Sequence, residues 1–137
     1  MKLFSLFFFS LLLLISCGES GNITVLSEYS NCGIEESKFI VIENNDEWKS
    51  KYHYFLKEYP PKYLNKDEVG VFIFLGTRPS NGFRIEFVKS EEKDSRLQIF
   101  VKEIIPKEGE GPLTVLTYPC IALKVLKTDK TIEVIYE

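Results

Sequence analysis

The chain has 137 residues, with 17 Lys or Arg, 20 Asp or Glu and one His, which gives a formal charge of −3 at pH 7. This length is enough for one domain with a hydrophobic core. The acidic balance and the lack of a Lys/Arg-rich run argue against binding to nucleic acid or to an anionic membrane surface.

The first 16 residues have the layout of a secretory signal peptide. Lys2 is their only charge, and the apolar stretch from Leu3 to Ile15 is too short for a comfortable membrane span. The segment ends in Leu14-Ile15-Ser16-Cys17, which resembles the lipobox of bacterial lipoproteins. The alternative is an ordinary signal peptide followed by an incidental cysteine.

We therefore expect cleavage before Cys17 and attachment of several acyl chains to that residue, which gives stable anchoring in the bacterial cell envelope, outside the cytoplasm. Residues 17–22 are small and polar and form the predicted flexible tether, and residues 23–137 form the predicted single domain. Removal of residues 1–16 takes away Lys2 alone, which leaves 16 basic and 20 acidic residues and a formal charge of −4.

The start of the domain predicts two strands and then a helix. The β-prone runs are Ile23–Leu26 and Lys38–Ile42, separated by a turn at 30–33. Asn44 and Glu47 resemble a capping box, and Pro60-Pro61 stops the helical pattern. Its apolar stripe, which we expect to pack on the sheet, consists of Trp48, Tyr52, Phe55, Leu56 and Tyr59. His53 lies off this stripe and is predicted to face solvent.

The run from Val69 to Val88 predicts two strands joined by a loop. The first strand, up to Leu75, is apolar on both faces and is therefore expected at the centre of a sheet. The second alternates between apolar and polar residues from Phe83 onward. Because Pro and Asn-Gly favour a tight reversal in the loop 76–82, we predict that the two strands form a hairpin.

The remaining pattern predicts three more strands. One runs from Arg96 to about Ile105, and the segment 106–112 after it is expected to be an exposed, mobile loop. Two further strands, 121–125 and 132–136, flank a turn at 128–130 and are predicted to form a second hairpin. The expected fold class is α+β, a mainly antiparallel sheet of six or seven strands with one amphipathic helix packed on it.

The usual catalytic constellations are missing from the sequence. His53 has no evident partner, no cysteine pair has zinc spacing, and the Gly76 to Gly82 segment lacks a phosphate-loop pattern. We expect a protein that is not an enzyme and that has no metal or cofactor, although an unrecognised hydrolase built from distant carboxylates is an alternative. Cys32 and Cys120 are predicted either to pair in a disulfide or to lie separately as small buried hydrophobes.

The segment from Phe74 to Ile85 contains Gly76-Thr77-Arg78-Pro79-Ser80-Asn81-Gly82-Phe83. It resembles the C-terminal domain family of the protease complex subunit PrcB, whose hallmark is roughly Gly-x-Arg-Pro-Thr-Gly-Gly-Tyr. Leu116 to Val125 is similar to the last strands of that family, and Cys32-Gly33-Ile34 and Glu47-Trp48 are similar to its entry region. The resemblance implies a lipoprotein module that assists the assembly or stability of a secreted protease complex.

This resemblance implies that the loop binds a protein partner, an extracellular protease. The predicted contact residues are Gly76, Arg78, Pro79, Asn81, Gly82, Phe83, Tyr118 and Pro119. Arg78 offers a planar fork of donors, and Phe83 and Tyr118 offer aromatic anchors. Alternatively, Arg78, Pro79 and Gly82 shape the loop and hold it against the segment that contains Tyr118.

A second binding function is protease inhibition. The segment 78–83 also resembles the Asn-Pro-Thr-Thr-Gly-Tyr loop of chagasin-like cysteine-protease inhibitors, although the Trp expected after the second Pro is missing. That resemblance implies an inhibitor that acts through the loops 76–83, 106–112 and 117–120.

Overall fold

The computed structural model describes residues 22–59, 61–108 and 114–137. The predicted signal peptide, the lipidation site Cys17 and the tether up to residue 21 lie outside the described residues, as does the part of the predicted 106–112 loop from 109 onward. Within the described part of the chain, no helix has the length and apolar character that a membrane crossing requires.

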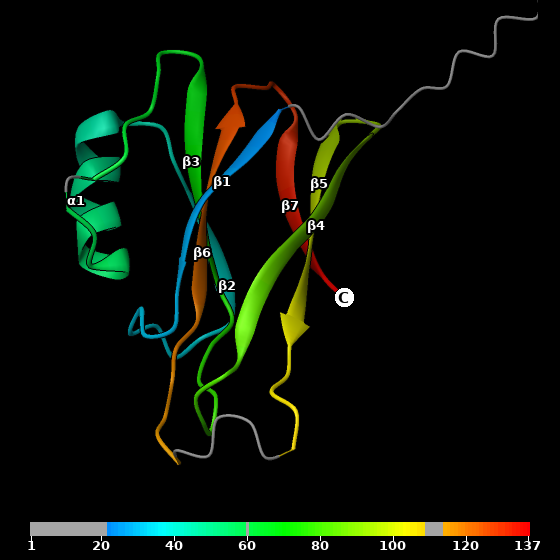
Figure 1. Cartoon of the computed structure of the whole chain (residues 1–137). Helices are drawn as coiled ribbons and strands as arrows, with labels where there is room; N and C mark the ends of the chain where they lie inside the picture. Colours follow the sequence, from blue (N-terminus) through cyan, green and yellow to red (C-terminus); the bar gives the residue numbers. More distant parts are fainter. Residues whose placement is uncertain (1–21, 60, 109–113) are drawn as a thin grey trace, which may run out of the picture.

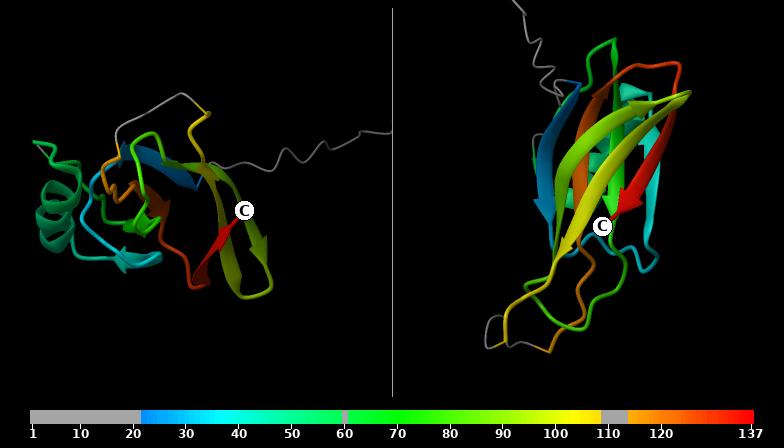
Figure 2. Two further views of the ribbon diagram at one scale, coloured as in Figure 1. Left: turned by 90° about the horizontal axis from the view of Figure 1, so that it is seen from below. Right: turned by 90° about the vertical axis from the view of Figure 1, so that its right-hand side faces the viewer.

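The described residues of the domain form two sheets and one helix (Figure 1). The four-stranded sheet has the order β1-β6-β3-β2, and the three-stranded sheet has the order β4-β5-β7. Helix α1 covers the face of the four-stranded sheet that points away from the other sheet (Figures 1 and 2). The elements are β1 Ile23–Tyr29, β2 Lys38–Ile42, α1 Asn45–Leu56, β3 Glu68–Phe74, β4 Arg84–Lys93, β5 Arg96–Ile104, β6 Cys120–Leu126 and β7 Thr131–Tyr136.

The expected α+β class is confirmed, but the strands divide between two sheets and neither predicted hairpin forms. Strand β3 pairs with β2 and β6, so both of its edges are occupied and β4 pairs with β5 instead. Strand β6 is likewise flanked by β1 and β3, and β7 therefore adds to β5 in a parallel arrangement. The connections that were predicted as hairpin turns in fact cross from one sheet to the other.

The alternation of side chains along β3 and β6 divides the core into two clusters. One set of side chains points into the space between the sheets, where Val71, Ile99 and Leu123 are fully buried. The other set points toward α1, where Phe72 and Phe74 meet the helix. Both faces of the four-stranded sheet are therefore covered, which explains why β3 is apolar at every position except Glu68 and Gly70.

Helix α1 packs its predicted stripe on the sheet, but it ends earlier than expected. The side chain of Asn44 accepts hydrogen bonds from the N–H groups of Asp46 and Glu47 at 2.9 and 3.0 Å, as the capping pattern predicts. Lys57 takes a left-handed conformation and closes the helix. The prediction that Tyr59 belongs to the stripe is wrong: it lies beyond this cap and is 84% exposed.

A half-buried polar contact ties the end of α1 to β1. The hydroxyl of Tyr52 donates to Glu58 at 3.0 Å, and the hydroxyl of Ser27 in β1 donates to the same carboxylate. Burial, followed by the hydrogen bond to Glu58, raises the pKa of the Tyr52 hydroxyl well above its usual value. Tyr52 therefore acts as a neutral donor, and His53 beside it faces solvent as predicted.

Candidate functional site: the loop end

The β3–β4 and β5–β6 connections meet at one end of the two sheets, together with the β1–β2 connection (Figures 1 and 2). We call the described residues 77–83, 105–108 and 114–118 of the first two connections the tip. The tip contains most of the contact residues that were predicted from the sequence. It lies at the end of the molecule opposite the start of β1 (Figure 1).

A disulfide joins the base of the tip to the β1–β2 connection. Cys32 and Cys120 are bonded, with their Cα atoms 6.0 Å apart, and both side chains are buried. The N–H of Cys32 donates to the carbonyl of Tyr118 at 2.8 Å, and the N–H of Tyr118 donates to the carbonyl of Ser30 at 2.9 Å. Of the two alternatives that the sequence left open, the structure therefore has the bridge, and the bridge holds the Tyr118 segment in place.

Arg78 is engaged inside the tip by both its backbone and its side chain. Its N–H and carbonyl pair with Thr117 at 2.8 and 2.9 Å, so that the two connections form a short antiparallel bridge. Its guanidinium donates to both carboxylate oxygens of Glu103, with Nε–Oε1 at 2.5 Å and Nη2–Oε2 at 3.4 Å. The fork of donors is therefore satisfied within the chain, and Arg78 braces the tip.

We predict that Arg78→Ala lowers the free energy of unfolding by about 1–2 kcal/mol, because it breaks a two-point ion pair whose side chains are only 25% and 29% exposed. Arg84→Ala is the matched control, since its pair with Glu28 is 56% and 41% exposed and is expected to contribute less than about 0.5 kcal/mol. Urea unfolding compares the two variants. Equal losses would show that Arg78 does not brace the tip.

Two glycines allow the connections to approach each other. Gly76 has φ +89°, and a Cβ there would lie 3.1 Å from the backbone carbonyl oxygen of Glu35. Gly82 has φ +92°, and a Cβ there would lie 2.8 Å from Cβ of Pro106 in the other connection. Both residues therefore shape the tip, because a side chain would be strained at this φ and would collide with the neighbouring segment.

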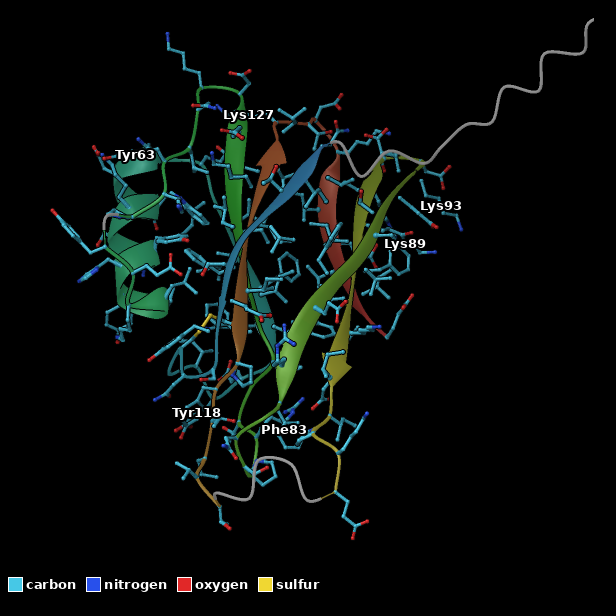
Figure 3. The ribbon with its side chains drawn as sticks, in the orientation of Figure 1. Tyr63, Phe83, Lys89, Lys93, Tyr118 and Lys127 are labelled. Carbon is cyan, nitrogen blue, oxygen red and sulfur yellow. A yellow bond between two sulfur atoms is a disulfide. The ribbon has the colours of Figure 1, made fainter. Side chains whose placement is uncertain are left out.

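The remaining predicted contact residues differ in exposure. Pro79 is exposed, Asn81 is half-buried, and the buried Pro119 uses its carbonyl to accept the N–H of Leu75 at 2.9 Å. Phe83 and Tyr118 are half-buried and lie at the loop end in Figure 3. Pro79, Phe83 and Tyr118 are therefore the predicted residues with apolar surface that a partner can reach.

Phe83 also lines a small cavity beside the tip. Its volume is about 250 Å³, and its walls come from the ends of β1, β4 and β6. Two of the lining side chains, Glu28 and Arg84, form an ion pair. The lining residues are Glu28, Tyr29, Ser30, Phe83, Arg84, Ile85, Pro119 and Cys120.

The sequence reasoning missed three exposed apolar side chains of the tip. Ile105, Val115 and Leu116 are 66%, 53% and 57% exposed and belong to the β5–β6 connection. Val115 and Leu116 have a signal in the sequence, because they stand outside any strand or helix period in a connection rich in Gly, Pro and charge, whereas Ile105 was placed at the end of the predicted strand. The tip therefore presents apolar contact surface on a braced support.

The described groups with a shifted pKa lie outside the tip. Besides Tyr52, burial raises the pKa of Tyr136 in β7, and the hydrogen bond to Glu91 raises the pKa of the exposed Lys89 in β4. In the described ranges, no group of three or more His, Cys, Asp and Glu is arranged to hold a metal ion.

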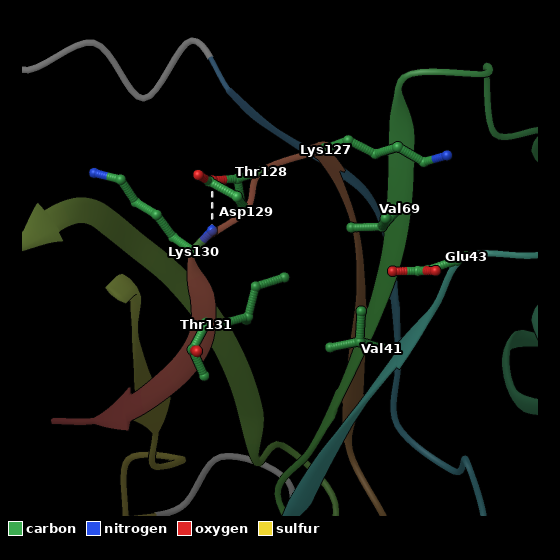
Figure 4. Close-up of a pocket in the computed structure, with 9 residues that line it drawn as sticks. Val41, Glu43, Val69, Lys127, Thr128, Asp129, Lys130 and Thr131 are labelled. Carbon is green, nitrogen blue, oxygen red and sulfur yellow. Dashed lines mark hydrogen bonds between the residues drawn. The ribbon is translucent and has the colours of Figure 1, made fainter. Parts of the chain in front are cut away.

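A larger cavity lies at the other end of the molecule (Figure 4). Its volume is about 610 Å³, and it occupies the gap between β7 and the β2–β3 edge of the four-stranded sheet. Tyr136, at the far end of β7, bridges to β2 and β3: its single hydroxyl proton is shared between the carbonyl oxygens of Phe74 and Lys38, which lie 3.3 and 3.4 Å from the hydroxyl oxygen. The lining mixes apolar side chains with charges of both signs: Val41, Glu43, Val69, Lys127, Thr128, Asp129, Lys130, Thr131 and Ile132.

The fold and the tip define a small two-sheet α+β domain with a disulfide-clamped, apolar loop end. Residues 70–126 match the model of the family described as PrcB C-terminal. The match begins in β3 and ends with β6, so it contains the whole tip and confirms the resemblance seen at 74–85 and 116–125. The similarities at Cys32-Gly33-Ile34 and Glu47-Trp48 lie outside the matched residues. No curated protein and no solved structure matches the chain.

Proposed function

We propose that this protein is a non-catalytic, lipid-anchored binding module that contacts a protein partner through its tip. The observation that carries the proposal is the exposure of Ile105, Val115 and Leu116 beside the partly exposed Phe83 and Tyr118. Apolar side chains that gather at one exposed place are typical of interaction sites. Aromatic anchors contribute much of the binding energy in protein interfaces, and the apolar side chains around them exclude water from the contact.

The bracing of the tip supports this proposal energetically. Association costs free energy for every loop and side chain that must be ordered. Here the Cys32–Cys120 disulfide, the Arg78–Glu103 ion pair and the Arg78–Thr117 backbone bridge already hold the described parts of the tip in the free protein. A preorganised tip therefore retains more of the binding energy of its apolar contacts.

The family match supports a partner in a secreted protease complex. The segment that matches the PrcB C-terminal model includes every described residue of the tip. We propose that the module assists the assembly or stability of such a complex. The disulfide supports an extracytoplasmic location, because disulfides form and persist in oxidising compartments. The anchor itself is proposed from the Leu14-Ile15-Ser16-Cys17 segment.

Replacement of Val115 and Leu116 by Asp is expected to weaken capture of the partner at least about tenfold, since loss of two apolar contacts removes on the order of 1.4 kcal/mol or more. The matched control replaces Val25 and Leu126 by Asp. These residues are of the same types, are 47% and 43% exposed, and lie on the sheet away from the tip.

The partner is first identified by a photo-crosslinker at Leu116 in cells, with the same crosslinker at Leu126 as reference. We expect an extracytoplasmic protease or its precursor to be captured from Leu116 and not from Leu126. The proposal is wrong if both positions capture the same proteins, or if the two double variants bind the identified protein equally well.

Protease inhibition is the second candidate, favoured by the convergence of the β3–β4 and β5–β6 connections at one end. An inhibitor that wedges into an active-site cleft needs its loops arranged in this way. Assays against papain-like and subtilisin-like proteases separate the two functions. Inhibition that the Val115/Leu116 double variant loses favours an inhibitor, whereas capture of a precursor without inhibition favours assembly.

A further inference from the structure

The chain enters the domain at the end opposite the tip. The carbonyl of Asn22 accepts the N–H of Leu126 at 3.0 Å, and β1 then runs antiparallel to β6 until Tyr29 lies beside Cys120. Figure 1 shows the start of β1 at the upper end of the sheets and the tip at the lower end. Strands β1 and β6 therefore separate the point of attachment from the contact surface.

The length of this separation follows from strand geometry. Strand β6 has seven residues, and at about 3.3 Å per residue it spans roughly 23 Å. The extended residues 117–119 add about 10 Å, which places the tip about 30 Å from Asn22. The tether between Cys17 and Asn22 spans at most about 20 Å when fully extended, given a limit of roughly 3.3–3.6 Å per residue.

These two lengths exclude a domain that stands upright with its tip in the bilayer and Asn22 at the top. For the tip to enter the bilayer end-on, Asn22 would have to stand about 30 Å above the lipid surface, which is farther than a tether of about 20 Å reaches. A domain that lies flat would bring its side against the headgroups. The formal charge of −4 after loss of residues 1–16 opposes that arrangement on an anionic membrane.

We infer that the anchor holds the tip on the side away from the bilayer, about 30–50 Å above it, so that the partner is a polypeptide surface standing clear of the membrane. The tip reaches a surface close to the headgroups only when the domain lies flat or tilts tip-down, which the acidic charge of the domain opposes. This inference rests on the anchor and the tip contact proposed above, and it defines which part of a partner can bind.

Energy transfer to the bilayer tests the orientation without any partner. The full lipoprotein is reconstituted into vesicles that carry an acceptor dye on the lipid headgroups. A donor dye is attached to Lys107→Cys in the tip or to Lys127→Cys at the opposite end. Both lysines are exposed, and the new cysteine is the free thiol because Cys32 and Cys120 are bonded and Cys17 carries the lipid.

We expect energy transfer from position 107 to be several-fold weaker than from position 127. Equal transfer from the two positions would overturn the inference and would indicate a domain that lies flat. Stronger transfer from position 107 would also overturn it, because the tip would then face the lipid. Labelled protein that begins at residue 18, and therefore carries neither the lipid nor the apolar residues 3–15, is the reference, and it is expected to show no transfer because it does not bind the vesicles.

Tether length provides a second, independent measurement. Insertion of a flexible Gly/Ser segment of about 20 residues before Asn22 is expected to make the two positions nearly equal, because the longer tether lets the domain tumble. A difference that survives this insertion would overturn the argument from tether length. Partner capture in detergent is scored separately, so that loss of capture with the orientation intact contradicts the proposed function alone.

Discussion

Replacement of both Cys32 and Cys120 by Ala is expected to lower the free energy of unfolding by about 3–5 kcal/mol. The bridge joins residues separated by 88 positions, and closing so long a loop in the unfolded chain removes much of its conformational entropy. The same change is expected to weaken partner capture, because the bridge holds the Tyr118 segment at the base of the tip.

Urea unfolding followed by the fluorescence of Trp48, the single tryptophan, measures this loss. Wild-type protein unfolded in the presence of a reductant is the control, and its transition should coincide with that of the double variant. Mass spectrometry of the oxidised protein should detect no free thiol at either position. Identical transitions for the double variant and the oxidised wild type would contradict the stabilising role of the bridge.

Gly70→Ala is expected to cost about 3 kcal/mol, at the upper end of the range for overpacked cores. A Cβ at this position of β3 would lie 2.1 Å from Cε3 of Trp48, well inside any permitted contact. Trp48 has 0% exposure, and its ring stacks on Phe72 with centroids 4.4 Å apart. Because the indole ring is packed on all sides, it cannot move away from the new Cβ, and either α1 or β3 must shift.

A double-mutant cycle with Trp48→Leu identifies the cause. The smaller side chain removes the atoms that the new Cβ would meet, so Gly70→Ala should cost less than about 1 kcal/mol in that background. Circular dichroism follows unfolding in both backgrounds, since protein with Trp48→Leu has no tryptophan whose fluorescence could be measured. Additive costs would show that the loss does not come from contact with the indole ring, and strand propensity cannot account for it because Ala is favoured over Gly within a strand.

Local sequence signals predicted the elements of the fold well. The cap at Asn44, the stripe Trp48–Leu56 and the strand Lys38–Ile42 depend on residues a few positions apart, and the structure has them where the patterns placed them. The end of α1 was predicted too late. The helix ends at the left-handed Lys57, and Glu58 after it contacts Ser27 and Tyr52. Neither feature produces a periodic pattern of residues in the sequence.

Within the site, the glycines and the Arg-Pro segment pointed to the correct loop. The environment of Arg78 could not be predicted, because Glu103 comes 25 residues later and reaches it only once β5 has paired with β4. Ile105, Val115 and Leu116 were missed for a related reason. Exposure of an apolar residue in a connection depends on what packs over it, which no local pattern encodes.

The sequence by itself determined which segments are strands and helix, and which of their faces are apolar, because these properties follow from spacing along the chain. The tertiary structure decided which strands pair, since β3 and β6 each have two edges and those edges are taken by partners distant in sequence. Because those edges are occupied, β4 and β7 pair with β5 and form a second sheet. This pairing thereby brought the β3–β4 and β5–β6 connections together as the tip.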